Sequence, residues 1–234
     1  ICFVDSDDYV LPEMYGKMLA AALEHQVDIC VCQWQYEQID GTHSIDLSKV
    51  DATLFGKMSS LEFARFLYKG AYENGVVVMP CNKLIKRSFF QTLRFVGEYL
   101  EDNRLMGLIF AEEFPIFVMN DQFYVYYQNL DSNTHQKFQA RNLWMLDILS
   151  ERLALYPDDP FIVQESKRLY CNLYIEYFFD AKAANVPMPN TKQFRAYLRD
   201  LVRNGECTMK FAVRMLLFLI SPAAYHCLLV RSHP

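Results

Sequence analysis

The chain opens with Ile1-Cys2-Phe3-Val4-Asp5-Ser6-Asp7-Asp8, an apolar run that ends in a cluster of acidic residues. A run of consecutive apolar residues is typical of a β-strand that is covered on both faces, as in a parallel sheet. Ligands of open α/β sheets bind at the carboxyl ends of such strands. The opening therefore predicts a buried strand over residues 1–4 and a candidate site at the acidic turn that follows it.

The acidic turn has two interpretations. The carboxylates of Asp5, Asp7 and Asp8 repel one another, and a hard divalent cation lowers that repulsion by sharing their charge. Mg²⁺ or Mn²⁺ fits, because either binds carboxylate oxygens and phosphate oxygens at the same time. Alternatively, the turn is a solvated cap, since acidic residues are favourable near the start of a helix. The spacing by itself leaves both interpretations open.

The segments that follow indicate an α/β sheet. Pro12 suits the first turn of a helix, and the apolar residues after it keep helical spacing. Residues 28–36 are mostly apolar and predict a second strand. A strand, loop, helix and strand in this order favour an α/β fold over residues 1–36.

Further elements are expected up to residue 127. Ser59 and Glu62 form a capping box, which predicts that a helix begins there. A second buried run covers residues 76–79. The other expected elements are a short helix over residues 82–95, a helix that contains residues 105–110, and strands over residues 114–119 and 123–127.

Only helical periods follow from about residue 137, so we expect a domain boundary near 136. The expected helices cover residues 138–155, 160–184, 191–203 and 208–230, the last three with Asp159, Asn190 and Thr208 as N-caps. The predicted fold class is therefore α/β: a partial, Rossmann-like mixed sheet over residues 1–136, and an all-helical region over residues 137–234.

The composition bounds the function. Hydrophobic residues make up 52% of the 234 positions and aromatic residues 15%, which is enough for a sizeable core and excludes intrinsic disorder. The net charge of -5 argues against a nucleic-acid partner. The chain has seven cysteines and no C-x-x-C pair, so we expect reduced cysteines in a cytosol rather than a zinc or redox motif.

Other candidate site residues have a functional and a structural interpretation each. Asn82 and Lys83 offer an amide and a cation to a phosphate or a sugar, or else open a helix. Glu101 and Asp102 include a candidate general base, or else are acids at the start of a helix. His135 stands alone and has no neighbouring cluster that would make it a zinc ligand.

In this order, the segments resemble bacterial family 2 glycosyltransferases of the GT-A fold, which build capsule, exopolysaccharide and lipopolysaccharide units. The resemblance covers about 135 residues and rests on several ordered matches rather than on one motif. The matching segments are residues 1–10 with Pro12, Met14 and Tyr15, residues 28–32, residues 81–87, residues 99–103, and residues 124–135, which end in Ser-x-x-His.

The resemblance implies roles for the acidic residues. Asp5 would lie near the ribose of a nucleotide sugar. Asp7, with Asp8 as neighbour or co-ligand, would hold Mn²⁺ or Mg²⁺ on the diphosphate. Asp102 would take the proton from the acceptor hydroxyl in an inverting transfer, with Glu101 as its substitute.

The resemblance also implies substrates, location and extent. Asn82, Lys83 and His135 would belong to the donor or acceptor pocket. The acceptor would be a glycan or a lipid-linked glycan, and the enzyme would be cytoplasmic. A nucleotide-binding half should precede Ile1 in this family, so the chain is expected to be an N-terminally truncated fragment that is inactive by itself.

Two alternatives belong to other classes. An apolar strand followed by D-x-D also opens haloacid-dehalogenase-type phosphatases, in which Asp5 would be the nucleophile and Asp7 the acid and base. That family continues with Gly-Thr, whereas Asp8 and Tyr9 follow here. The second alternative is a non-catalytic module, in which the helices bind a partner or residues 207–231 rest on the inner face of the plasma membrane. The simpler expectation for these last residues is a helix packed in its own bundle.

Overall fold

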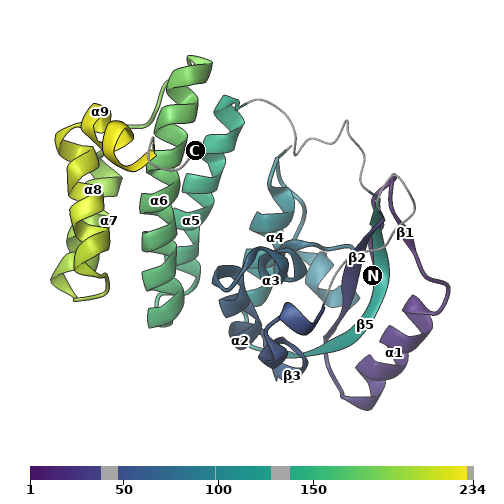
Figure 1. The fold of residues 1–234 in the computed structure, drawn as a ribbon. Helices are drawn as coiled ribbons and strands as arrows, with labels where there is room; N and C mark the ends of the chain where they lie inside the picture. The colour runs from purple at the N-terminus through teal and green to yellow at the C-terminus, as the bar shows by residue number, and fades with distance from the viewer. Residues whose placement is uncertain (38–46, 98, 128–137, 231–234) are drawn as a thin grey trace. The chain divides into compact units, whose positions relative to one another are not determined.

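The computed structural model describes residues 1–37, 47–97, 99–127 and 138–230. Its chain divides into two compact units, residues 1–136 and residues 137–234. The first unit contains a sheet with helices, and the described part of the second unit contains helices (Figure 1). We treat each unit by itself.

The sheet of the first unit is mixed and has the order β1-β5-β2-β4, with β3 beside β5. β2 and β5 run parallel, and the other pairs are antiparallel. This arrangement confirms the predicted α/β class. The strands are β1 (Tyr9–Val10), β2 (Ile29–Glu37), β3 (Gly56–Ser59), β4 (Lys83–Ile85) and β5 (Pro115–Tyr127).

Helices cover both faces of the central strands. Helix α1 (Met14–Glu24) lies on one side of β2 and β5, and helices α2, α3 and α4 lie on the other (Figure 1). Because both faces are covered, residues 29–34 of β2 are all buried, which explains why that strand is nearly continuous in apolar residues. The bounds of the second group are α2 (Ser60–Arg65), α3 (Ala71–Val78) and α4 (Glu101–Phe110).

The predicted buried strand over residues 1–4 is wrong. The side chains of Ile1 and Val4 are 41% and 45% exposed, and no strand is formed there. Only the backbone of Ile1 exchanges hydrogen bonds with Ile85 of β4, at 2.7 and 2.9 Å. An apolar run becomes a buried strand when strands pair with it on both sides. Among the described strands, only β4 lies beside this segment.

Two further predictions in this unit are corrected. Residues 82–95 were expected to be a helix, but residues 83–85 form β4 and only Arg87–Gln91 makes a 3₁₀ turn. Pairing of β4 with β2 overrides the local preference, with Ile85 opposite Ile29. The two strands expected over 114–119 and 123–127 are one strand, β5, because the intervening polar residues keep the extended backbone.

Local capping signals are confirmed more closely. Ser59 and Glu62 form the predicted capping box at the start of α2. The residues of the buried run at 76–79 are largely buried as predicted, on helix α3.

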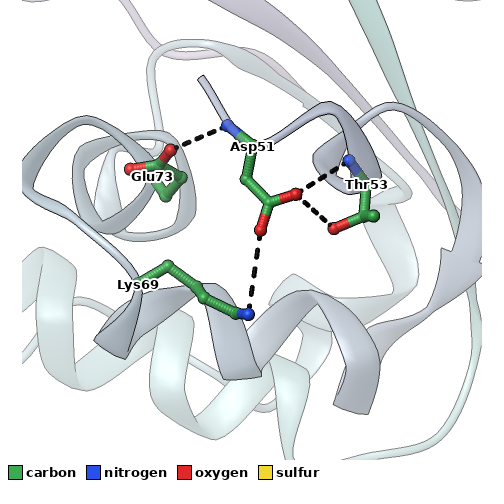
Figure 2. Close-up of polar contacts among 4 residues, drawn as sticks. All are labelled: Asp51, Thr53, Lys69 and Glu73. Atoms are coloured by element: carbon green, nitrogen blue, oxygen red, sulfur yellow. Dashed lines mark hydrogen bonds and ion pairs between the residues drawn. The ribbon is translucent and has the colours of Figure 1, made fainter. Parts of the chain in front are cut away.

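A polar cluster fixes the segment that leads to β3 (Figure 2). In it, Glu73 of α3 accepts from the amide of Asp51 at 3.1 Å, and Asp51 accepts from the amide and hydroxyl of Thr53 at 3.0 and 2.6 Å.

The second unit follows the predicted helices with small shifts. Asp159 caps α6 by accepting from the amide of Ile162 at 2.9 Å, and Thr208 caps α8. The helix predicted over 208–230 breaks at Ser221, because Pro222 lacks the amide hydrogen that would continue it. The helices are α5 (Trp144–Leu155), α6 (Pro160–Ala184), α7 (Lys192–Arg203), α8 (Met209–Ile220) and α9 (Pro222–Tyr225).

Asn190 was expected to cap α7, but Thr191 occupies the N-cap position. Asn190 still contributes, since its Oδ1 accepts from the amide of Lys192 at 2.9 Å.

An aromatic core joins three helices of this unit. The ring centroids of Tyr174 on α6, Phe194 on α7 and Phe218 on α8 lie 5.1 to 6.3 Å apart.

Candidate active site

The acidic turn is anchored to the end of β5. The amide of Asp8 donates to the carbonyl of Asp5 at 3.2 Å, which closes the turn. The Tyr124 hydroxyl donates to one carboxylate oxygen of Asp8, and the Tyr127 amide donates to the other at 2.9 Å. The Tyr124 hydroxyl oxygen also accepts from the amide of Asp5 at 3.3 Å. A strand far along the chain therefore sets the position of the turn.

The carboxylates of the turn differ in environment. Asp5 and Asp7 are exposed, whereas Asp8 is half-buried. Burial raises the pKa of Asp8, and the charges of Asp5 and Asp7 add to the rise, while the hydrogen bonds from Tyr124 and Tyr127 oppose it. Asp8 is thus the anchored member of the group, and Asp7 is an accessible one.

The turn fits a metal only together with a ligand. In the described part of the chain, no group of three or more His, Cys, Asp or Glu side chains is placed to hold a metal ion. Both carboxylate oxygens of Asp8 already accept hydrogen bonds from β5. The exposed oxygens of Asp5 and Asp7 are hard ligands of the kind that Mg²⁺ and Mn²⁺ take, with the remaining positions filled by phosphate oxygens or water. The donor set suits a cation shared with a diphosphate rather than a closed protein cage.

The structure places Asn82 and Lys83 inside the fold. Both are fully buried. The Lys83 ammonium donates to the carbonyls of Val76 and Met79 and to Oδ1 of Asn82, the first at 2.6 Å and the last at 2.9 Å. The Asn82 amide donates to the carbonyl of Cys32 at 3.0 Å. These hydrogen bonds connect β2, α3 and β4. Asn82 and Lys83 therefore stabilise the sheet and α3 and are not exposed to a ligand.

Asp102 and Glu101 occupy the first turn of α4. Burial raises the pKa of Asp102, and the charge of Glu101 adds to the rise, while the amide of Asn103, which donates to Asp102 at 2.6 Å, opposes it. A carboxylate with a raised pKa holds a proton more readily than an ordinary aspartate does. Of the two acids, Asp102 therefore has the environment of a general base.

Cys81 precedes β4, and Lys83 begins it. Burial raises the pKa of the Cys81 thiol to about 12, and the charge of Asp5 adds to the rise. Burial lowers the pKa of Lys83 to about 7, and the charge of Asp102 counteracts this in part. Charges of both acidic groups therefore act on residues 81–83.

Tyr124 and Cys81 were not among the expected site residues. Tyr124 lies 116 positions from Asp8, so no local motif marks it. The only signal is its place in the aromatic strand that the sequence singles out. His135, an expected substrate contact, lies outside the described residues, and its role stays a prediction.

Sequence comparisons find similarity to glycosyltransferases. The family model described as glycosyl transferase family 2 matches residues 1–94. The uncharacterized glycosyltransferase YibD of Escherichia coli (strain K12) is 28% identical over 111 residues, which cover 43% of this chain and 32% of YibD.

Two solved structures share the fold. Staphylococcus aureus TarS 1-349 in complex with UDP-GlcNAc superposes with a TM-score of 0.53 and 13% identity over 96% of this chain and 63% of that one. A second crystal structure of S. aureus TarS 1-349 superposes with the same TM-score of 0.53 at 12% identity. At these identities the likeness concerns the fold alone.

Residues 1–94 are thus similar to glycosyl transferase family 2, and the sheet with its helices has the α/β fold of the TarS structures. The chain spans about a third of the length of YibD and 63% of the TarS chain. None of these relatives is described as a phosphatase, so the phosphatase alternative gains no support.

Proposed function

We propose that the protein is an inverting, metal-dependent hexosyltransferase of cell-surface polysaccharide synthesis, which transfers a sugar from a nucleotide sugar to a glycan or lipid-linked acceptor. The observation that carries the proposal is the acidic turn, in which Tyr124 and Tyr127 of β5 anchor Asp8 while Asp5 and Asp7 stay exposed. Exposed carboxylates that are held by a rigid strand suit the cation that accompanies a diphosphate.

On the donor side, the exposed Asp5 is assigned to the ribose and the exposed Asp7 to the cation. A divalent cation held there would neutralise the diphosphate that leaves. Asp8 is the weaker ligand candidate, because both of its oxygens accept hydrogen bonds from β5. Its main task is to hold the turn so that Asp7 projects toward the diphosphate. The UDP-GlcNAc in the description of the TarS structure supports a nucleotide sugar as the class of donor.

On the acceptor side, the carboxylate of Asp102 is assigned as the base. The acceptor hydroxyl oxygen forms a bond to the anomeric carbon while the bond from that carbon to the phosphate oxygen breaks. The hydroxyl proton goes to Asp102, whose raised pKa suits a proton acceptor. Glu101 is the alternative base. Asn82 and Lys83 shape the pocket by fixing residues 79–83, not by direct contact.

A cytoplasmic location is part of the proposal. All seven cysteines are free thiols, and four of them are buried: Cys30, Cys32, Cys81 and Cys171. Reduced, buried cysteines are typical of proteins that work in a reducing compartment.

The test uses the full-length protein, with donor binding measured by calorimetry in the presence of Mn²⁺ and sugar transfer measured separately. We expect Asp7→Ala to lose donor binding. Asp102→Asn should keep donor binding and lower transfer about 10²- to 10⁴-fold. Asp121→Ala, which removes an exposed acid in the middle of β5, is the matched control and should change neither. Transfer at the original rate in either Asp7→Ala or Asp102→Asn contradicts the assigned role, and Glu101→Gln identifies the base if Asp102 fails.

A further inference from the structure

Helix α8 is apolar on the face that it turns to solvent. Its core face carries Phe211, Met215 and Phe218, which are buried. The opposite face is lined by large apolar side chains spaced by about one helical turn, of which Met209 and Ile220 are 79% and 82% exposed. We call this face the α8 stripe; its residues are Met209, Val213, Leu216 and Ile220.

The α8 stripe differs from the set of residues that the sequence offers for membrane contact within 207–231. That set has Lys210, Arg214 and Arg231 beside Phe211, Met215, Leu216 and Leu219, and only Leu216 belongs to the stripe. In the structure, Phe211 and Met215 face the core, and Arg214 contacts Asn172 of α6 and lies over the ring of Phe211. The helix packs in its own bundle, as the simpler expectation had it. Its outer face is apolar as well, whereas a helix with one face in water normally carries polar residues there.

The neighbouring helix α7 carries a row of cations on its solvent face. Its core face is formed by Phe194, Leu198 and Leu201, which are buried. The exposed basic residues are three or four positions apart, so they lie on one side of the helix. This α7 stripe consists of Lys192, Arg195, Arg199 and Arg203. Helices α7 and α8 pack against each other within the same unit (Figure 1).

Charge is segregated around these two helices. Residues 192–230 contain six Lys and Arg against two Asp and Glu, whereas the rest of the chain contains 17 against 26. One of the two acids, Asp200, is paired with Lys167 of α6 at 3.2 Å. The segment that carries the two stripes is therefore cationic in a chain that is acidic as a whole.

We propose that the α7 and α8 stripes together bind the surface of a bilayer that contains anionic phospholipids. The α8 stripe enters the interfacial region, and the α7 stripe lies on the lipid phosphates. A second copy of the chain fits this face less well. A twofold pair would use the same patch on both copies and would bring two cationic stripes together. None of the described helices combines the length and the apolar character needed to cross a bilayer.

The test is flotation of the whole chain with phosphatidylcholine vesicles and with vesicles that also contain phosphatidylglycerol. We expect binding to the anionic vesicles that weakens with salt. The triple variant Arg195→Gln, Arg199→Gln and Arg203→Gln should lower the partition about a hundredfold. The double variant Leu216→Ser and Ile220→Ser should lower it about tenfold or more, at low and at high salt.

The matched controls remove the same residue types from exposed positions of the first unit. Leu23→Ser on α1, where the side chain is 70% exposed, and Arg87→Gln should leave the partition unchanged. Circular dichroism verifies that each variant folds, which is expected because the altered side chains are exposed.

Equal vesicle binding by the stripe variants and the parent chain overturns the proposal, and so does a parent chain that ignores anionic vesicles. A dimer that Ile220→Ser dissociates, found without vesicle binding, assigns the face to a second copy instead. No donor or acceptor is present in this assay, so its outcome is independent of sugar transfer.

Discussion

The hydroxyl of Tyr124 donates a hydrogen bond to the carboxylate of Asp8, 116 positions earlier in the chain. Tyr124 is fully buried in β5, and its hydroxyl oxygen also accepts from the amide of Asp5. One side chain thus holds both ends of the acidic turn. The turn is exposed, but its position is set by a rigid strand, which is the arrangement expected for a binding site.

We expect Tyr124→Phe to loosen this turn. The hydrogen bond from Tyr124 opposes the rise in the pKa of Asp8, so its loss raises that pKa further. We expect the free energy of unfolding, measured in urea at pH 7, to fall by about 1 kcal/mol, and donor affinity to fall with it. Tyr126→Phe removes a hydroxyl from the same strand and should have a smaller effect. Equal losses of unfolding free energy and donor affinity in both variants would show that the hydrogen bond from Tyr124 to Asp8 does not stabilise the turn.

Asp102→Asn should separate activity from stability. Because burial raises the pKa of Asp102 in the folded protein, the folded state binds a proton more tightly than the unfolded state does. This group therefore lowers stability as the pH rises from the unfolded pKa through the folded pKa. We expect Asp102→Asn to be more stable than the parent protein at neutral pH while transfer is lost.

The measurement is thermal unfolding of both proteins across pH 4 to 8, with transfer rates for the parent protein. The difference in stability should grow as the pH rises, and the parent rate should fall on the acid side as Asp102 is protonated. A variant that is less stable than the parent at every pH would contradict the assigned environment of Asp102.

Lys83 should make stability increase with pH above neutrality. Burial lowers its pKa from 10.5 to about 7, so between these values the unfolded chain binds a proton that the folded chain releases. Lys83→Met removes this dependence. At the alkaline end of that range, the variant should be less stable by about 1–3 kcal/mol, since the carbonyls of Val76 and Met79 lose their donor.

Denaturant unfolding of the parent and the variant at several pH values tests this. Lys86→Met is the control, because Lys86 is exposed and pairs with Asp28 at the surface, and its removal should cost less than about 1 kcal/mol. Parallel pH profiles for the parent and Lys83→Met would disprove the prediction.

Gly70→Ala should disturb the polar cluster of Figure 2. A Cβ at position 70 would lie closer to Oε2 of Glu73 than van der Waals contact allows, so Glu73 must move away from the amide of Asp51. We expect a loss of about 1 kcal/mol in the free energy of unfolding. Gly16→Ala on α1 is the control; no atom lies within 4 Å of its added Cβ, and it should gain about 0.5–1 kcal/mol.

Combining Gly70→Ala with Glu73→Ala tests the cause. If the contact with Glu73 is responsible, the double variant should lose less than the two single losses added together. Simple additivity would show that Gly70 acts through another contact.

The acids of the candidate site can be picked out from the sequence, but their arrangement cannot. Asp5, Asp7, Asp8 and Asp102 stand out in the sequence because acids follow an apolar run or begin a helix. The same sequence gave no sign that Asn82 and Lys83 point inward, since an amide and an ammonium look equally suited to a ligand and to buried carbonyls. Which of these they meet depends on how β4 pairs with β2.

The sequence alone determined the features that rest on neighbours a few positions apart. The capping box of Ser59 and Glu62 and the caps at Asp159 and Thr208 form as expected, because their hydrogen bonds close over three residues. Only the tertiary structure decided that residues 1–4 are not buried between strands and that Tyr124 donates a hydrogen bond to Asp8. It also decided that one apolar face of α8 packs in the core while the other is exposed. These depend on contacts between distant segments, and a local pattern of side chains does not specify which distant segment will meet it.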